Sequence, residues 1–331
     1  MKEPAEWDLR APFGWKSIIV ISIGLGVLSF TGKNTEIDKM MGYLGEWGSD
    51  IVGIKETSQV GRGTEKLQHQ MWPMIIAERT SVERIDGFNP DKLPRFSYLE
   101  TEEKVIRNYN PDTLQLEEKV ETSEVLVEPF GYLIHVCKKM GQSLEIALWG
   151  TIIAVVVSIP LAYSSARNYT PNRVGYHLSR GTVSFLRAIP ELISALFLVL
   201  AFGFGPIAGV LALGLHCAGF LGKFYAEDIE NADKDPQEAL LAINAGKVKT
   251  LWYAVLPQVF PQYVAYTLYI LDRNVRMATV VGIVGAGGIG MELKGRFDMF
   301  NYGHVTTILI VLFITVFILD QIAAAIRSKL I

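Results

Sequence analysis

The sequence predicts an all-α polytopic membrane protein with about six transmembrane helices and a soluble insert after the first of them. Of its 331 residues, 50% are hydrophobic, more than a soluble core of this size needs. The mean hydropathy is +0.27. The apolar residues are concentrated in runs of membrane length, and one long segment between the first two runs is rich in charge.

The first predicted helix lies near the start of the chain, over residues 13–32. An uncharged apolar run from Ser17 to Phe30 forms its centre, with Trp15 and Lys16 at its edge. A signal peptide is the alternative interpretation, but its charged flank would need to be more basic, and no small-x-small cleavage site clearly follows. We therefore expect residues 1–32 to form an N-terminal tail and an uncleaved first helix.

A soluble extracytoplasmic insert is predicted over residues 33–141. Its charged residues are frequent, its acids outnumber its bases, and Gly-Arg-Gly, Asn-Pro and Leu-Pro breaks recur. Its carboxylates are scattered, and His69 has no neighbouring Cys or His ligand set. The sequence thus indicates neither a catalytic residue nor a metal site here, and it leaves the role of the insert open.

Five further membrane-length runs follow within residues 142–331. Pro160 is placed to kink the first of them, and the third is rich in Gly and Ala, which allows close helix contacts. The five runs are Leu144–Ser164, Val183–Phe204, Gly205–Leu221, Leu251–Leu271 and Val305–Ile326.

Flanking Lys and Arg residues predict the orientation. The connection over residues 165–181 holds three Arg and no acid, and the C-terminal tail is basic as well, so both are expected in the cytoplasm. Six alternating spans then place both termini and the 230–250 loop in the cytoplasm and the insert outside. Four basic residues fit this count less well, and some of them are expected in a protein-lined cavity: Arg273, Arg276, Lys294 and Arg296.

Several function classes find little support in the sequence. The net charge of −3 gives no sequence-wide basic footprint for nucleic acid. The two cysteines, Cys137 and Cys217, are too few for a disulfide framework and are interpreted as packing residues.

Two glycine-rich nucleotide motifs can be considered. Residues 285–290 fit G-x-G-x-x-G, but membrane-length runs on both sides argue against a dinucleotide-binding fold. No G-x-x-x-x-G-K-[ST] motif occurs, so we expect no cofactor in this chain and ATP hydrolysis, if any, by another one.

A helix, a break and a second helix are predicted between two of the apolar runs. Asp235-Pro236 starts the first helix, and Asn244 and Gly246 are the residue types that most readily adopt a left-handed backbone. This arrangement predicts a compact knuckle. An amphipathic helical hairpin on the membrane surface, without a partner, is the alternative.

The knuckle resembles the EAA coupling loop of ABC-importer permeases, in which Glu-Ala-Ala is followed by a Gly and then by Leu-Pro. Glu238 and Ala239 stand nineteen and eighteen positions before Pro257, which Leu256 precedes. Leu240 replaces the second Ala, and Asn244 stands where the Gly is expected, with Gly246 two residues later. The resemblance implies that residues 227–257 contact an ATPase, with Glu238 in its groove and Ala239 permitting close approach.

Other stretches are similar to the phosphonate-type branch of these permeases, which also handles phosphite. The resemblance covers residues 142–331, and the preceding insert is longer than expected in that branch. It implies a type I ABC-importer core in the bacterial cytoplasmic membrane, with a second permease copy, a cytoplasmic ATPase dimer that binds ATP and Mg, and an external or periplasmic solute-binding protein. The stretches are SFLRAIPEL from Ser184, GPIAGVLALGLH from Gly205, LGKFYAEDIEN from Leu221, LPQVFPQYVAYTLY from Leu256 and NVRMATVVGIVGAGGIG from Asn274.

Carriage of a phosphorus oxyanion requires cationic or dipolar groups that offset lost hydration. Arg187, Asn274 and Arg276 are the candidate pathway residues. For Arg187, snorkelling to lipid headgroups is an equal alternative, and Glu191 is available to pair with it. His216 and Asp320 are interpreted as interhelical polar contacts.

The glycines of the G-x-G-x-x-G stretch are expected to form a close helix approach or non-helical backbone near the external end of the pathway. These pathway or gate glycines are Gly285, Gly287, Gly288 and Gly290.

Two other functions remain as alternatives. An ion-driven secondary transporter of a small anion would need intramembrane acid chains and repeat halves, and apart from Asp320 and Glu191 neither is found. A membrane-anchored enzyme would need a nucleophile or metal constellation in the insert. The sequence does not fix which phosphorus oxyanion is carried, or whether the second permease copy is identical.

Overall fold

The computed structural model describes residues 14–51, 58–90, 93–94, 96–110, 115–170 and 172–330. The predicted tail before residue 14 lies outside these residues. The chain divides into two compact units, residues 1–70 and 71–331. Most of the described residues are helical, which confirms the predicted fold class.

The described part of the first unit is almost entirely helical. The predicted first span is helix α1 (Trp15–Asn34), whose apolar side chains between Ile18 and Phe30 are exposed, as contact with lipid would require. Helices α2 (Ile37–Ile51) and α3 (Gln59–Met71) follow. Helix α2 also exposes large apolar side chains, so this part of the predicted insert is not uniformly polar.

The second unit begins with a three-stranded antiparallel sheet, which the all-α prediction did not include. Its strands are β1 (Glu78–Ser81), β2 (Tyr98–Asn110) and β3 (Gln115–Glu128), in the order β1-β3-β2, and the short 3-10 helix η1 (Val82–Arg84) follows β1. Tyr98 pairs with Val127 at the base of the β2–β3 hairpin. The charge density of these strands hides the two-residue alternation that predicts a strand.

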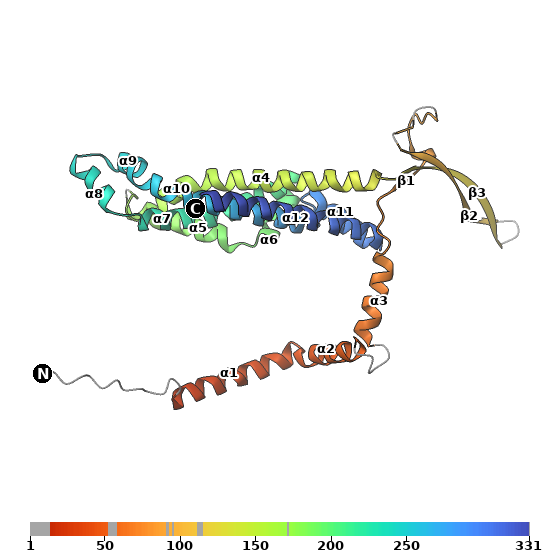
Figure 1. The fold of residues 1–331 in the computed structure, drawn as a ribbon, viewed down its shortest axis with the longest axis horizontal. Coiled ribbons are helices and arrows are strands. Elements are labelled where there is room, and N and C mark those ends of the chain that lie inside the picture. Colours follow the sequence, from red (N-terminus) through yellow and green to blue (C-terminus); the bar gives the residue numbers. More distant parts are fainter. Residues whose placement is uncertain are drawn as a thin grey trace. The chain divides into compact units, whose positions relative to one another are not determined.

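A helical bundle forms the rest of the second unit (Figure 1). Helices α4, α7 and α12 are each long and apolar enough to cross a membrane, and counting each bent helix pair as one span gives up to six among the described residues. This agrees with the predicted number. The elements are α4 (Gly131–Ser165), α5 (Arg173–Ala188), α6 (Glu191–Phe202), α7 (Pro206–Asn231), α8 (Asp235–Ala242), α9 (Lys247–Thr250), the π-helical turn η2 (Leu251–Val255), α10 (Leu256–Ile283), α11 (Gly288–Asp298) and α12 (Tyr302–Leu330).

Two predicted boundaries differ from the structure. Helix α4 starts at Gly131, so the expected domain boundary at residue 141 falls inside a helix. Its 35 residues span about 52 Å, more than the hydrocarbon thickness of about 30 Å, so one end of α4 extends beyond the lipid tails.

The run predicted as one span over 183–204 is two helices, α5 and α6, bent by 89°. Pro190 lies at the break, and the residue before it, Ile189, is extended, with φ −81° and ψ 121°. Proline has no N–H to donate and disfavours helical backbone in the residue before it, so the helix ends at Ala188.

Small residues allow α7 to lie at the centre of the bundle. Gly150 of α4 lies against Leu213 of α7, and Gly214 of α7 lies against Ile153 of α4. A Cβ on Gly219 would stand 2.8 Å from the backbone nitrogen of Arg187 on α5. These close approaches confirm that the glycine- and alanine-rich run is a helix-packing surface.

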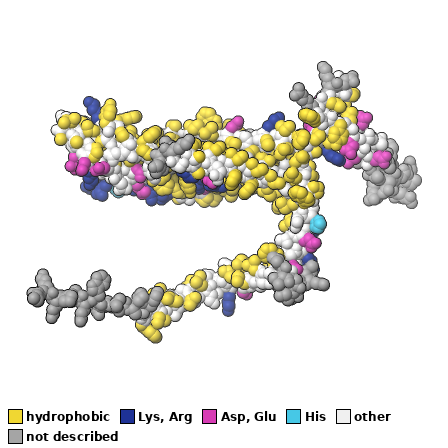
Figure 2. Space-filling view, viewed as in Figure 1, with side chains coloured by type: hydrophobic (Ala, Val, Ile, Leu, Met, Phe, Trp, Pro, Cys, Tyr) yellow, Lys and Arg dark blue, Asp and Glu magenta, His cyan; other side chains and the backbone are white. Residues whose placement is uncertain are grey.

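Apolar and charged side chains occupy different parts of the bundle surface. Figure 2 shows apolar side chains over much of its length and charged side chains gathered at the end that carries α8 and α9. An apolar lateral surface with a charged end is the pattern of a bundle that crosses a bilayer.

Candidate functional site

The knuckle, residues 235–250, is built as the sequence predicted. Helix α8 begins with Pro236 in its first turn and ends before Asn244, which has a φ of +64°. The N–H of Asn244 donates to the carbonyl of Leu241 at 2.9 Å, and that of Ala245 to the carbonyl of Leu240 at 3.0 Å. This pair of bonds is a Schellman motif, in which asparagine is the common substitute for glycine.

The second residue expected in the break behaves differently. Gly246 is extended, with φ −68° and ψ 157°, and it precedes the first turn of α9. One left-handed residue is enough, because the Schellman bonds already reverse the chain at Asn244.

The outer face of the knuckle combines charge with exposed apolar surface. Glu238 and Ala239 are both exposed. Leu241 and Ile243 expose 51% and 75% of their surfaces. Exposed large apolar side chains near a charged group are typical of a surface that binds another protein.

The inner face of the knuckle is held by Gln237. The hydroxyl of Tyr169, in the connection between α4 and α5, donates to Oε1 of Gln237 at 2.8 Å. Nε2 of Gln237 donates to the carbonyl of Asp233 at 2.9 Å. Burial, followed by the nearby Tyr163, raises the pKa of Tyr169 above its ordinary value. The phenol is therefore protonated at neutral pH and remains a donor to α8.

The knuckle is also tied to the start of α10, where Leu256 and Pro257 lie. Oε1 of Gln258 accepts the N–H of Asp233 at 3.0 Å, and Nε2 of Gln258 donates to the carbonyl of Ala254 at 2.7 Å. Pro257 stands in the first turn of α10, where its missing N–H costs least. The π-helical turn η2 ends at Val255, two residues before this proline, which cannot supply the N–H that would continue an α-helical ladder.

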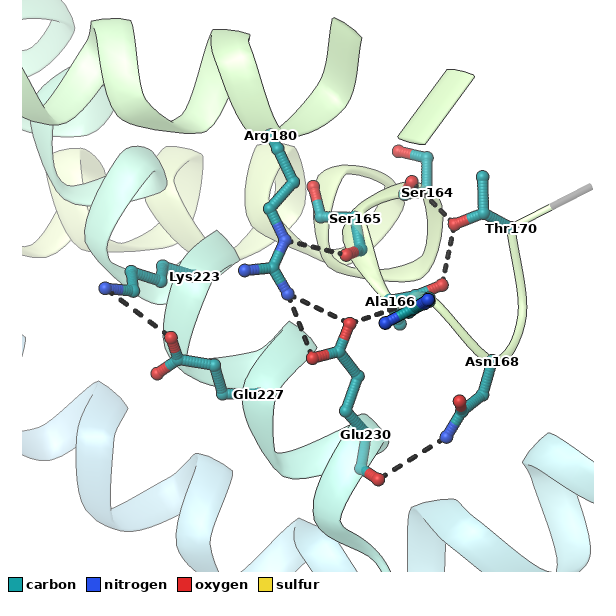
Figure 3. A network of polar contacts seen from close by, with 10 residues as sticks. Ser164, Ser165, Ala166, Asn168, Thr170, Arg180, Lys223, Glu227 and Glu230 are labelled. Atoms are coloured by element: carbon teal, nitrogen blue, oxygen red, sulfur yellow. Dashed lines mark hydrogen bonds and ion pairs between the residues drawn. The ribbon is translucent and has the colours of Figure 1, made fainter. Parts of the chain in front are cut away.

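A polar network lies where α4 and α7 end beside α5 (Figure 3). Nη2 of Arg180 donates to both carboxylate oxygens of Glu230, at 2.9 and 3.0 Å, and Nε of Arg180 donates to the carbonyl of Ser165 at 3.1 Å. The N–H of Arg167 donates to Oε1 of Glu230 at 2.7 Å. Glu230 thus joins three elements immediately before the chain leaves α7 for α8.

The four predicted gate glycines lie together where α10 gives way to α11, in a segment called here the glycine turn (residues 285–290). Gly285 and Gly287 precede α11, and Gly288 and Gly290 lie in its first turn. Gly285, Gly287 and Gly288 have φ values of +99°, +82° and +71°, which side chains other than glycine rarely adopt. A Cβ on Gly290 would collide with the carbonyl oxygen of Thr279. The predicted non-helical backbone and close helix approach are both present. A helix, α10, and not a strand precedes the motif, which agrees with the sequence argument against a dinucleotide-binding fold.

The glycine turn is joined to two other parts of the bundle. The N–H of Gly205, between α6 and α7, donates to the carbonyl of Gly285 at 3.1 Å. The N–H of Ile289 donates to Oγ of Ser143 on α4 at 2.8 Å. The turn is therefore a structural junction of α4, α7, α10 and α11.

The predicted pathway residues lie in different surroundings. Asn274 is fully buried, donates to Oγ1 of Thr151 at 2.9 Å and accepts from Sγ of Cys217 at 3.1 Å. Arg276 is about half exposed and forms an ion pair with Asp272 at 2.8 Å. Arg187 is partly exposed, and its guanidinium lies 5.7 Å from the ring centroid of Phe220. The structure does not bring these three side chains into one site, and their transport roles stay predictions.

The sequence suggested that Glu191 pairs with Arg187, and the structure shows different partners. Its carboxylate binds Nη2 of Arg273 at 2.7 Å and Nε2 of His216 at 3.2 Å. His216 also contacts the carbonyl of Ile189 through Nδ1 at 2.9 Å. The bend at Pro190 turns Glu191 toward α7 and α10 and away from α5, which carries Arg187. His216 is an interhelical polar contact, as predicted.

The sequence analysis did not predict two of these clusters, the one around Glu230 and the one around Glu191. Arg180 was used only as a topology signal and Arg273 only as an exception to it. A possible signal for Arg273 is its place in a largely apolar run, where a charge implies a partner. No local signal identifies Glu230, because fifty residues separate it from Arg180.

These features define a polytopic, permease-like helical bundle with an exposed helix–turn–helix knuckle at one end. The chain belongs to the family described as binding-protein-dependent transport system inner membrane component, whose model matches residues 158–331. It is therefore a multi-pass inner-membrane permease subunit of an ABC importer, a class that works with an ATPase and a substrate-binding protein.

Named relatives and solved structures agree with the family. HtxE of Stutzerimonas stutzeri, named as a phosphite transport system permease protein, is 62% identical over 261 residues, which are 79% of this chain and 100% of the relative. PtxC of the same organism, also named for phosphite transport, is 43% identical over 56% of this chain and 68% of its own length.

The phosphate-import permease protein PhnE of Mycolicibacterium smegmatis is 40% identical over 58% of this chain and 36% of its own length. Among solved structures, a chain of the MetNI methionine ABC transporter in an inward-facing conformation has a TM-score of 0.51 and 22% identity, covering 62% of this chain and 99% of that one. This last likeness supports the fold alone.

Proposed function

We propose that this permease imports phosphite or a closely related phosphorus oxyanion, such as a phosphonate. The observation that carries the proposal is the 62% identity to a phosphite-system permease over that relative's whole length. The described spans and the ATP-coupling family favour this function over an ion-driven transporter of a small anion.

The proposed transporter contains two copies of this chain, an ATPase dimer that binds ATP and Mg, and an external solute-binding protein. Both termini and the knuckle lie in the cytoplasm in this arrangement, and the segment between α1 and α4 lies outside. The basic connection between α4 and α5, which holds Arg167, Arg173 and Arg180, supports this orientation.

The knuckle is the proposed contact with the ATPase. Glu238 and Ala239 lie on its exposed face, together with Leu241 and Ile243, and would enter a groove of the ATPase. Asn244 fixes the turn, and Leu256 and Pro257 begin α10 beneath it. Because Gln237 and Gln258 tie the knuckle to the α4–α5 connection and to α10, closure of the ATPase pair would move these helices together and rock the bundle.

Arg187, Asn274 and Arg276 are proposed to influence the pathway, with the glycine turn as a junction where helices can shift. Of the three, Arg187 is best placed to bind an anion, because it is partly exposed and has no carboxylate within ion-pair distance among the described residues. Asn274 would act through helix packing.

Reconstitution tests the proposed function. The permease is co-purified with its ATPase, inserted into proteoliposomes and supplied with its solute-binding protein and labelled phosphite. We expect uptake that requires ATP and Mg, with a methylphosphonate arm to measure the substrate range. Uptake driven by an ion gradient without ATP, or no uptake of either anion while another solute is carried, would overturn the proposal.

A further inference from the structure

A small pocket lies at the end of the bundle that carries the knuckle. Its volume is about 130 Å³, and it is bordered by the end of α4 and by α5 and α7. Three cationic side chains line it, together with two hydroxyl-bearing residues. The cations are Arg180, Arg187 and Lys223, and the hydroxyls are Ser165 and Ser184.

The spacing along α5 explains why these groups gather. Arg180, Ser184 and Arg187 follow one another at intervals of four and three residues, which places them on one face of a helix. Lys223 faces them from α7, where Gly219 and Gly222 allow α5 to approach closely.

The pocket has one more cation than it has acidic partners. Arg180 is paired with Glu230 at 2.9 Å and Lys223 with Glu227 at 3.5 Å, and Figure 3 shows both pairs. Arg187 forms no ion pair with any carboxylate of the described residues and lies over the ring of Phe220. A partly buried guanidinium left without a carboxylate favours an anion.

The hydroxyl of Ser165 is a second, independent observation. Ser165 is 1% exposed, and its Oγ finds no hydrogen-bond partner among the described residues. Buried polar atoms are normally bonded, so an unpartnered hydroxyl at the edge of a cationic pocket indicates that something else binds there.

We propose that Arg180, Arg187, Lys223, Ser165 and Ser184 form a binding site for a phosphorus oxyanion group. The pocket has room for several water molecules, and so for one small tetrahedral anion, but not for a large organic ligand. Guanidinium, ammonium and hydroxyl groups are the donors that such oxygens accept.

Two sources can supply this group. One is a free anion such as phosphite or phosphate on the knuckle side of the membrane, which rests on the proposed function and would make the pocket a release-side site. The other is the phosphate of an anionic lipid, since polybasic pockets near the membrane boundary bind such headgroups.

Binding by the purified permease–ATPase complex tests the proposal and separates the sources. One arm measures equilibrium binding of radiolabelled inorganic phosphate, with competition by phosphite, to the complex in zwitterionic nanodiscs. The other counts phosphatidylglycerol retained by the complex after purification from mixed phosphatidylglycerol and phosphatidylcholine vesicles. Saturable phosphate binding assigns the free anion, and selective retention of phosphatidylglycerol assigns the lipid.

Arg187→Gln is the decisive variant. It should weaken the observed binding at least about tenfold, the loss expected for one charge-assisted contact. Arg173→Gln is the matched control, because it removes the same charge from an exposed position on the same helix, and binding should stay within about twofold. If Arg187→Gln does not assemble, Lys223→Gln gives the same test.

Three results would overturn the proposal: wild-type complex that binds neither ligand, an Arg187→Gln complex that binds like wild type, or equal losses in both arginine variants. None of them depends on uptake. A complex that imports phosphite but shows no Arg187-dependent binding refutes the pocket and leaves the proposed function standing.

Discussion

Nη2 of Arg180 on α5 contacts both carboxylate oxygens of Glu230 on α7, at 2.9 and 3.0 Å, and the two side chains are 31% and 24% exposed. The same arginine donates to the end of α4 through the carbonyl of Ser165. This single pair therefore holds together three helices at the point from which the knuckle projects. It makes the position of the knuckle dependent on the packing of the bundle.

Removal of this pair should destabilise the bundle. Arg180→Ala leaves a partly buried carboxylate without its main partner, and we expect a loss of about 1–3 kcal/mol. The measurement is the unfolding temperature of the detergent-solubilised complex. Lys294→Ala is the control, because Lys294 and Asp298 form an exposed pair on α11, whose loss should cost less than about 1 kcal/mol. Equal shifts for both variants would contradict the structural role of Arg180.

Charge reversal at Glu238 should uncouple transport. Glu238 is exposed and makes no hydrogen bond through its side chain within the described residues, so Glu238→Lys should leave insertion and thermal stability unchanged. If this carboxylate meets the ATPase, reversal should lower ATP-dependent uptake at least about tenfold. Glu102→Lys, an equal charge reversal at an exposed position of β2, should leave uptake unchanged. Normal uptake by Glu238→Lys would argue strongly against the knuckle as the coupling contact.

The glycine turn should not tolerate a methyl group at Gly290. A Cβ there collides with the backbone of Thr279, which cannot move away as a flexible side chain could. We expect Gly290→Ala to cost about 3 kcal/mol or more, measured as thermal stability and as the yield of monodisperse protein.

The same helix supplies the control for this prediction. Gly295 of α11 has open space where its Cβ would lie, so Gly295→Ala should be neutral or stabilise the helix by up to about 1 kcal/mol. A stable, fully active Gly290→Ala protein would show that the turn has more room than the structure gives it.

The two cysteines report on topology and packing. Cys137 is exposed near the start of α4, and Cys217 is 1% exposed within α7. A membrane-impermeant maleimide added to intact spheroplasts should label Cys137 from outside, and Cys217 should react only after denaturation. Cys137→Ser should abolish the label and Cys217→Ser should preserve it. Labelling of Cys137 only after the membrane is opened would reverse the proposed orientation.

Local features were predictable from the sequence. The membrane-length runs follow from composition alone, because a span must be apolar over its whole length whatever it packs against. The knuckle was equally predictable from the sequence. Pro236 starts α8 and Asn244 ends it, and both act through their own backbone preferences.

Other features needed more than local pattern. The run over 183–204 is largely apolar, so composition predicted one span, although Pro190 divides it into α5 and α6. The strands β2 and β3 were not predicted because their charged residues obscure the alternation of a sheet. At the first of these places the backbone preference set by Pro190 outweighs the average hydropathy of the segment.

The sequence by itself determined the apolar runs, the helix–turn–helix knuckle and the close packing at the glycines, since each depends on residues close together in the chain. Only the tertiary structure decided which charges meet. Arg180 finds Glu230, and Glu191 finds Arg273 and His216 instead of Arg187. The reason is physical: an ion pair depends on which helix faces approach one another, and here that approach is set by small residues on α7 and by the bend at Pro190.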